Sequence, residues 1–343
     1  MILFIIGNGF DRNLKLPTDY RNDLRRILKK NDIDRFNIID NLYFNNNEFL
    51  WSQFENKIGN IQEKAINDIS ESIDDDYQRF FNDNADPFPN PDPLSDQYID
   101  TDNAIYGAET QKPEPSLGFN NLWDYITSGI KEMVSEANKT KMVSPPAFKN
   151  MDSSQIYLNF NYTNTLERIY HISPKKILHI HGSLERNDNL IYGNDKVSSV
   201  DTSSFDINFE NPNLDELGSR DYPSNYNDFI DLITISESEQ KNIKNKLSND
   251  LNEENEQFKK EPKYNLLEKW LNQFEEKNIT QIIVLGHSLG KVDKGYFELI
   301  NQKYHSTTWC ISYYNKQDQV FENAQSLSFY NKLNFKQFNT LLK

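Results

Sequence analysis

Cysteine is almost absent from this chain: Cys310 is the single cysteine among 343 residues. A single thiol excludes a disulfide framework and any zinc site built from four cysteines. Cys310 lies in the strand-like run 307–311. This position favours a buried structural thiol over a reactive one.

Positive charge is also scarce, with 37 lysines and arginines against 52 aspartates and glutamates and a net charge of -15. Phosphate backbones are bound through lysine and arginine, so this balance argues against a broad surface for nucleic acid or for an anionic membrane. One segment does gather basic residues, and we interpret it as the solvated face of a helix: Arg21, Arg25, Arg26, Lys29 and Lys30.

Long hydrophobic runs are missing as well. The apolar start of the chain, residues 1–6, is short, and Asp11 and Arg12 follow soon after it. Such a run is too short for a signal peptide or a membrane span, so we expect a cytoplasmic protein with no membrane partner. Aromatic residues make up 13% of the chain, which supplies apolar bulk for a folded core.

What the sequence does contain is four short apolar runs, each followed directly by a polar motif. The runs 2–6, 156–158, 177–180 and 282–285 precede the motifs 7–11, 159–163, 181–183 and 286–290, in that order. In an open parallel α/β sheet, the loops behind the strand carboxyl ends share one edge, where ligands bind. We therefore predict a Rossmann-like parallel sheet flanked by helices, with a nucleotide site assembled from these loops.

The remaining pattern predicts a single α/β domain over 1–343, with two large helical or loop insertions at about 45–150 and 196–264. Helices are expected over about 61–81, 122–138 and 236–260, and another is expected to begin behind Thr18 as its N-cap. Prolines at every second position of 87–93 predict a surface excursion over 82–115. Residues 190–195 resemble one more short strand and turn.

The first two motifs each allow a ligand-binding and a purely structural interpretation. Gly7 and Gly9 permit a tight turn and a close approach of backbone to ligand. The third glycine of a dinucleotide fingerprint is missing, so a plain turn explains this motif equally well. Asn159 and Asn161 share a face of an extended strand. Either asparagine can hold a ribose hydroxyl or a water, or can bond to the loop backbone.

The third and fourth motifs contain the candidate nucleophile and bases. His179 and His181 alternate, but no carboxylate or cysteine cluster accompanies them, so we expect no metal. His181, before Gly-Ser, suits general acid–base work, whereas His179 is expected to be a buried histidine with a backbone partner. The motif 286–290 formally matches the nucleophile elbow Gly-x-Ser-x-Gly. The short remainder of the chain holds one histidine, His305, so we interpret Ser288 as a ligand-contacting or structural residue rather than a hydrolase nucleophile.

Taken in order, these motifs resemble the AbiH family of bacteriophage abortive-infection proteins. The resemblance rests on 5–11 with 16–20, on 159–167, on 179–183, and on 285–290 with Asp293. It spans almost the whole chain except the insertions. It implies an antiphage effector with an unknown phage-derived trigger, and it leaves homo-oligomerisation open.

The same motifs are similar, more distantly, to the sirtuin-type NAD-binding domain. Residues 7–11 with 17–21 resemble its glycine loop and the Pro-Asp-Phe-Arg stretch that follows, and 286–289 resemble the loop that holds the adenosine. Asn161 resembles the asparagine beside the nicotinamide ribose, and His181 resembles the catalytic histidine. Thr163 stands where the sirtuin pattern has an aspartate for the nicotinamide amide. The zinc-binding cysteines are absent, which argues against protein deacylation.

Sirtuin-like domains of defence proteins commonly hydrolyse NAD, so the resemblance implies cleavage of the nicotinamide–ribose bond of NAD, as substrate, to deplete the infected cell. Asn161 and His181 would be catalytic. The residues expected to bind NAD are Gly7, Asn8, Gly9, Asp11, Arg21, Thr163, Gly286, His287 and Ser288. Two alternatives stay open: a nucleotide-binding sensor without catalysis, and a toxin acting on nucleic acid, which the net charge disfavours.

Overall fold

A computed structural model describes residues 1–84, 112–113, 117, 120–142, 146–207, 234–315 and 318–342 of the chain. Its contacts form two compact units. The first consists of Met1–Asn60, Asn121–Val197 and Gln257–Lys343, and the second of Ile61–Asn120 and Ser198–Glu256. The second unit is made of sequence that falls within the two expected insertions, and the single-domain organisation stays a prediction.

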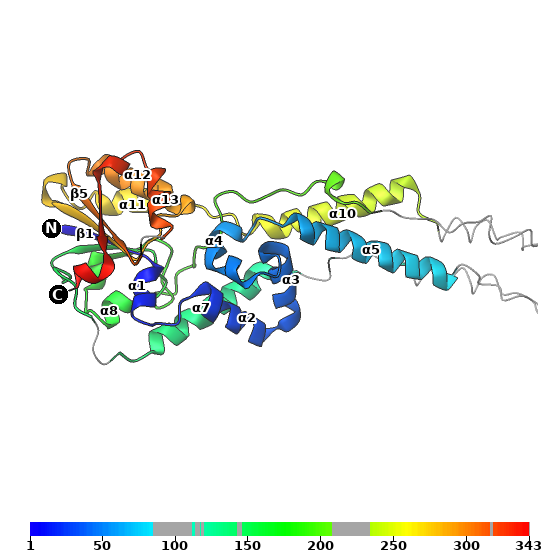
Figure 1. Cartoon of the computed structure of the whole chain (residues 1–343), viewed down its shortest axis with the longest axis horizontal. Helices are drawn as coiled ribbons and strands as arrows, with labels where there is room; N and C mark the ends of the chain where they lie inside the picture. The colour runs from blue at the N-terminus through cyan, green and yellow to red at the C-terminus, as the bar shows by residue number, and fades with distance from the viewer. Residues whose placement is uncertain are drawn as a thin grey trace, which may run out of the picture. The chain divides into compact units, whose positions relative to one another are not determined.

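The first unit is built on a sheet of six strands in which every neighbouring pair is parallel (Figure 1). The strands are β1 (Ile2–Ile6), β2 (Ile156–Asn159), β3 (Ile177–His179), β4 (Gln281–Leu285), β5 (Thr308–Tyr313) and β6 (Leu333–Gln337). Their order is β3-β2-β1-β4-β5-β6. This is the doubly wound order, in which the chain builds outward from β1 in both directions, and it confirms the predicted Rossmann-like class.

Helices cover both faces of the sheet, because successive residues of a strand point to opposite sides. Leu3 and Ile5 of β1 pack with α11 (Tyr264–Leu271), α12 (Lys294–Lys303) and α13 (Val320–Gln325). Phe4 and Ile6 pack on the other face with α1 (Asn8–Asn13), α7 (Leu122–Lys139) and α8 (Thr165–Arg168) (Figure 1). β1 is therefore buried at every position. Cys310 is a buried free thiol in the second of these groups, as expected.

A helical segment follows the first motif in the first unit. It comprises a π-helical turn (Tyr20–Leu24), α2 (Arg25–Asn31), α3 (Ile33–Phe44), a 3-10 turn (Glu48–Gln53) and α4 (Phe54–Lys57). Asp19, not Thr18, caps its start, since its side chain accepts from the Asn22 amide at 2.9 Å, so the predicted cap was wrong by one residue. Trp51 is fully buried and stacks on Phe44 with the two ring centroids 4.1 Å apart. This contact fixes the segment 48–57.

The second unit contains α5 (Glu63–Asn84), α10 (Glu237–Glu256) and a 3-10 turn (Thr202–Ser204). The predicted helices 61–81 and 236–260 are thus confirmed, as is 122–138 in the first unit. The predicted excursion over 82–115 lies largely outside the described residues. Short 3-10 turns complete the first unit: Pro174–Lys176, Glu276–Asn278, Lys291–Asp293, Tyr330–Lys332 and Phe338–Leu341. None of the described helices is long and apolar enough to cross a lipid bilayer.

The strand predicted at 190–195 is absent from the described structure, where Asn194 forms one isolated bridge with Lys259. Gly193 has φ +113°, and a Cβ there would lie 2.1 Å from the Phe258 carbonyl oxygen. The Asn194 amide donates to Phe258 O at 2.9 Å, and its carbonyl accepts from Lys260 N at 2.7 Å. The segment therefore pairs with residues 258–260 instead of joining the sheet, and this pairing fixes the backbone of Lys260.

Candidate functional site

The four predicted motifs meet at one edge of the sheet. The strand register aligns Ile6 of β1 with Asn159 of β2 and with Leu285 of β4, and it aligns Asn159 with His179 of β3. A cavity of about 420 Å³ opens at this edge, within the range of roughly 300–1,000 Å³ typical of small-molecule sites. It lies where the strand order reverses, between β1 and β4, the position at which doubly wound sheets bind ligands.

Nearly all the predicted site residues line this cavity: Gly7, Asn8, Gly9, Asp11, Asn161, Thr163, His181, Gly286, His287 and Ser288. Arg21 does not line it. Its guanidinium instead pairs with Glu48 at 2.5 Å and lies 4.0 Å from the centre of the Phe49 ring. The side of the helical turn on which Arg21 lies directs its side chain to these partners. Sequence spacing alone did not show that direction. The functional roles of the lining residues stay predictions.

Three glycines allow the β1 and β4 loops to touch. A Cβ on Gly7 would lie 2.6 Å from His287 Cα, and one on Gly9 would lie 2.7 Å from Gly286 O. Gly286 has φ +65°, and a Cβ on it would lie 2.1 Å from Phe10 N. The amides of Gly7 and Gly9 donate to Leu285 O at 3.0 Å and to Gly286 O at 2.7 Å. Loop-to-loop packing therefore explains these glycines without a ligand.

The asparagines of the second motif are both buried, but only Asn161 lines the cavity. Asn159 accepts the Asn161 amide at 3.0 Å, and Asn161 Nδ2 donates to Gly7 O at 3.3 Å. Asn161 is thus tied to the β1 loop. His179 contacts Glu167 Oε1 at 2.9 Å through Nε2 and the Asn161 carbonyl at 3.2 Å through Nδ1. It is a buried structural histidine with a backbone partner, as expected.

Asp11 lies fully buried beside Thr163, whose hydroxyl donates to Asp11 Oδ2 at 2.5 Å. Burial raises the pKa of Asp11 to about 6, while hydrogen bonds from Thr163 and Thr165 and the charge of Arg168 limit the rise. Asp11 Oδ1 is buried without a hydrogen-bond partner among the described residues. A carboxyl group thus lies against the Thr163 hydroxyl at the cavity.

His181 is 2% exposed and lies at the centre of a buried charged cluster. Its Nε2 is 3.3 Å from Asp293 Oδ1, which also receives Lys260 Nζ at 3.0 Å. Lys260 Nζ reaches Glu55 Oε2 at 2.9 Å, and the Tyr20 hydroxyl donates to Glu55 Oε1 at 3.1 Å. These four residues are here called the Asp293 cluster: Asp293, which lies next to His181, and Lys260, Glu55 and Tyr20, which are linked to Asp293 one after another.

Charges within the Asp293 cluster set its protonation. Burial alone raises the pKa of Asp293, but Lys260 and His181 bring it well below its usual range. Burial lowers the pKa of Lys260, but Asp293 and Glu55 raise it above its usual value. Burial and Lys260 lower the pKa of His181, and Asp293 offsets part of this. At neutral pH the carboxylate and the ammonium are therefore charged while the imidazole is neutral.

The fourth motif does not form a nucleophile elbow. His287 Nδ1 accepts the Leu289 amide at 2.9 Å, so its ring proton is on Nε2, which lies 3.4 Å from Asp293 Oδ2. Both ring nitrogens are thus engaged, and neither is free to activate Ser288. A 3-10 turn, Lys291–Asp293, separates the motif from α12, so the helix does not begin directly behind the serine as in an elbow.

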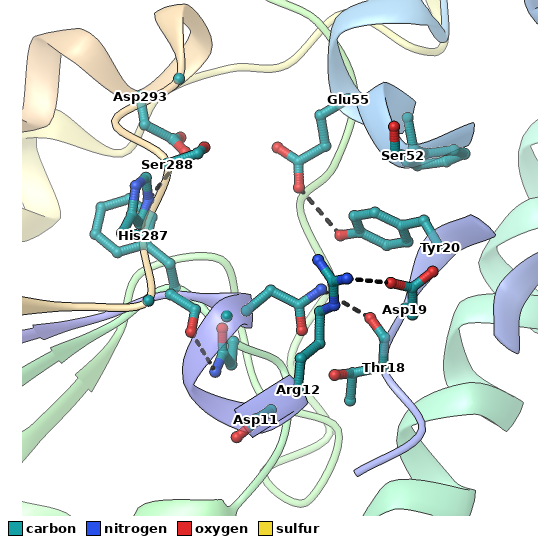
Figure 2. Close-up of a pocket in the computed structure, with 18 of the residues that line it drawn as sticks. Asp11, Arg12, Thr18, Asp19, Tyr20, Ser52, Glu55, His287, Ser288 and Asp293 are labelled. Atoms are coloured by element: carbon teal, nitrogen blue, oxygen red, sulfur yellow. Dashed lines mark hydrogen bonds and ion pairs between the residues drawn. The ribbon is translucent and has the colours of Figure 1, made fainter. Parts of the chain in front are cut away.

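Charged side chains surround the cavity opening. Figure 2 shows Asp293, His287 and Ser288 on one wall and Glu55, Tyr20 and Ser52 on the opposite one, with Arg12 extending between them. Arg12 is 58% exposed and pairs with Asp19 at 2.8 Å. Among the described lining residues it is the only arginine or lysine, whereas the acids are Asp11, Asp19, Glu55, Asp293 and Asp318.

Several of these residues could not be found from the sequence motifs. Glu55 and Lys260 fell within segments expected to be insertions, and Arg12 and Asp19 carried no signal beyond their neighbourhood to the first motif. Asp293 was part of the family pattern without an assigned role. In the described part of the chain, no cluster of three or more His, Cys, Asp or Glu side chains is arranged to hold a metal ion.

The basic segment behind the first motif is neutralised by acidic neighbours. Arg25 pairs with Asp40 at 3.6 Å, Arg26 with Glu136 at 2.6 Å, and Lys30 with Glu132 at 3.6 Å. In these pairs the positive charge that a phosphate backbone would need is already compensated by an acidic side chain.

Comparison with known proteins identifies the family. The model of the family described as bacteriophage abortive infection AbiH matches residues 3–313, which include all four motifs and the Asp293 cluster. Comparisons with curated proteins and with solved structures give no match. The chain belongs to the AbiH family of bacteriophage abortive-infection proteins.

Proposed function

We propose that this abortive-infection protein hydrolyses NAD at its nicotinamide–ribose bond. The observation that carries the proposal is that His181 and Asn161 line one cavity at the switch point of a doubly wound sheet, with His181 buried, neutral and 3.3 Å from the Asp293 carboxylate. The sirtuin-like motifs support the choice of NAD. Abortive infection itself follows from the family.

The reaction requires a base and a site that tolerates positive charge. The bond between the anomeric carbon and the nicotinamide nitrogen breaks, and nicotinamide leaves with the electron pair as a neutral molecule. Water forms the new bond to the anomeric carbon and gives up one proton, so the products are ADP-ribose, nicotinamide and a proton. The transition state has oxocarbenium character, as in other glycoside cleavages. Acidic lining side chains favour such a cation.

His181 is the proposed base, and Asn161 the residue that positions the water or the ribose. A base must be neutral at the working pH, and the lowered pKa of His181 keeps it so through the neutral range. Asn161 is buried and bonded to Gly7 O, so its amide is held at one orientation beside the cavity. Asp11, with Thr163, would supply the carboxyl group for the nicotinamide amide.

The test is nicotinamide release from NAD by the purified full chain, followed by chromatography, with and without phage lysate. A positioned base contributes typically 10²–10⁴-fold in rate, so His181→Ala is expected to lose about that factor while still folding. His305→Ala is the matched control, because His305 is 67% exposed and pairs with Glu276 away from the cavity lining; it should keep the parent rate.

Each other outcome names an alternative. Equal rates in the parent chain and His181→Ala would contradict the assignment of the base. Binding of NAD without nicotinamide release would indicate a nucleotide sensor. Failure to bind NAD, together with cleaved RNA or DNA in cells that express the protein, would indicate a toxin acting on nucleic acid.

A further inference from the structure

The Asp293 cluster brings together three chain segments that the sequence separates widely. Glu55 belongs to α4, Lys260 lies behind α10, and Asp293 ends the 3-10 turn behind β4. Lys260 is 3% exposed, and its backbone is fixed by the pairing of 258–260 with Asn194. An ammonium buried between two carboxylates is held in place by both, since each charge would be uncompensated without the others.

Three nitrogens lie near the Asp293 carboxylate; Lys260 Nζ donates a hydrogen bond to it, whereas His181 Nε2 has no hydrogen-bond partner among the described residues. Lys260 Nζ and His181 Nε2 approach Oδ1 at 3.0 and 3.3 Å, and His287 Nε2 approaches Oδ2 at 3.4 Å. An ionised carboxylate repels the lone pair of an imidazole nitrogen and attracts its N–H, so the charge of Asp293 favours the ring proton on the nitrogen that faces it. A neutral His181 has one ring proton, and its other nitrogen, Nδ1, is then the basic one.

From this geometry we infer that Asp293, fixed by Lys260, is a positioning residue that holds the ring proton of His181 on Nε2 and so makes Nδ1 the base. The inference rests on the proposed function for its catalytic meaning. The tautomer of His181 does not depend on the proposed function, because it is a property of the free protein.

Asp293 and Lys260 have opposite effects on the pKa of His181. The titratable neighbours are Asp293, Lys260, Glu55, Tyr162 and Tyr296, with the two tyrosine ring centroids at 6.4 and 6.2 Å. Burial raises the pKa of Tyr162 well above its usual range and that of Tyr296 to about 12, so both stay neutral. Asp293 raises the pKa of His181, whereas Lys260 lowers it. Removing each charge should therefore shift the pKa in opposite directions.

The experiment records ring ¹⁵N–¹H correlations of the full chain labelled at its five histidines, without NAD, over a range of pH. His181→Gln assigns the signal of interest. The parent chain should show His181 as the Nε2–H tautomer. Asp293→Asn should lower the pKa of His181 and abolish the single tautomer, because the negative charge that favours a proton on Nε2 is removed. Lys260→Met should raise that pKa.

Two further variants separate positioning from folding. Lys260→Met combined with Glu55→Gln removes one charge of each sign, and the pKa of His181 should still rise because Lys260 acts on it more strongly than Glu55. Asp40→Asn removes another buried carboxylate, which accepts from Trp51 Nε1 at 2.7 Å outside the cavity lining; it should leave the tautomer unchanged.

With NAD, Asp293→Asn should lower kcat at least tenfold with KM within about threefold, because Asp293 acts through His181. An Nδ1–H tautomer in the parent chain, or an unchanged tautomer and pKa in Asp293→Asn, would overturn the inference. If the spectra behave as expected but no nicotinamide is released, the proposed function fails and the positioning role of Asp293 stands.

Discussion

Asp11 is the residue whose burial is hardest to explain by stability alone. Its carboxyl group is fully buried, and its pKa is raised from 3.8 to about 6. The folded chain therefore binds this proton more tightly than the unfolded chain does. Its contribution to stability is greatest at low pH and falls as the pH rises from about 4 to about 6. At neutral pH the ionised carboxylate opposes folding by about 3 kcal/mol.

Asp11→Asn should therefore increase the free energy of unfolding at pH 7 by about 1–3 kcal/mol and should change it much less at pH 4.5. Urea denaturation at the two pH values measures the difference. An Asn variant that is less stable at pH 7 and keeps the pH dependence of the parent would contradict this explanation. A destabilising carboxyl beside a cavity is typical of a residue retained for binding.

His181 and its neighbours act as a unit, so the changes in the free energy of unfolding caused by single substitutions among them should not be additive. Asp293 and Lys260 are buried and form an ion pair, and Lys260 also pairs with the partly exposed Glu55. Breaking a buried ion pair by removing one partner costs about 3–5 kcal/mol in stability, far more than a surface pair contributes. The exposed pair Lys277–Glu275 at 2.9 Å offers the comparison within the same unit.

At the scale of elements, the contact between the β1 loop and the β4 loop shapes the site. Gly9 is separated from Gly286 by less space than a methyl group needs. Gly9→Ala should push the loops apart, lower the free energy of unfolding by about 1–3 kcal/mol and reduce ligand binding. Thermal denaturation and a binding titration with NAD measure the two effects.

Gly290 provides the control for that change. It lies in the same β4 loop, but a Cβ on it would meet only Ser288 Oγ at 3.6 Å, an ordinary contact. Gly290→Ala should be close to neutral in stability. Equal destabilisation by both substitutions would show that loop flexibility, rather than the contact between the loops, is what the glycines provide.

For the whole molecule, charge predicts which dinucleotide the proposed NAD hydrolase would prefer. The chain carries a net charge of -15, and acids outnumber bases among the described lining residues, with Arg12 as their single arginine or lysine. NADP adds a phosphate to the same framework as NAD, and that charge would enter an acidic field. We expect kcat/KM for NAD to exceed that for NADP at least tenfold at low salt, and the ratio to shrink as salt screens the field.

Steady-state kinetics with both dinucleotides at two ionic strengths provides the measurement. Asp19→Asn, at the cavity opening, should lower the ratio of kcat/KM for NAD to kcat/KM for NADP. Asp250→Asn removes the same charge from α10 in the second unit, and not from the cavity lining, so it should leave the ratio unchanged. A preference for NADP in the parent chain would mean that Arg12 outweighs the acids around it.

The sequence by itself determined strands β1 to β4 and the edge where the site forms, but not β6, and the strand it predicted at 190–195 was wrong. Buried parallel strands are short continuous apolar runs, and a polar motif directly behind each one must lie at the carboxyl edge, so both follow from local pattern. That is why β1, β2, β3 and β4, with Gly7, Asn161, His181 and Gly286 behind them, could be predicted.

Only the tertiary structure decided what surrounds His181 and what the glycines do. Lys260 and Glu55 are 205 residues apart in the chain, and no spacing rule relates such distant charges. Arg21 was predicted to bind the ligand and Arg12 was not, but Arg21 pairs with Glu48 and Arg12 lines the cavity. Local patterns determine strands and loops because those depend on neighbouring residues, whereas ion pairs and close backbone contacts depend on how distant segments pack.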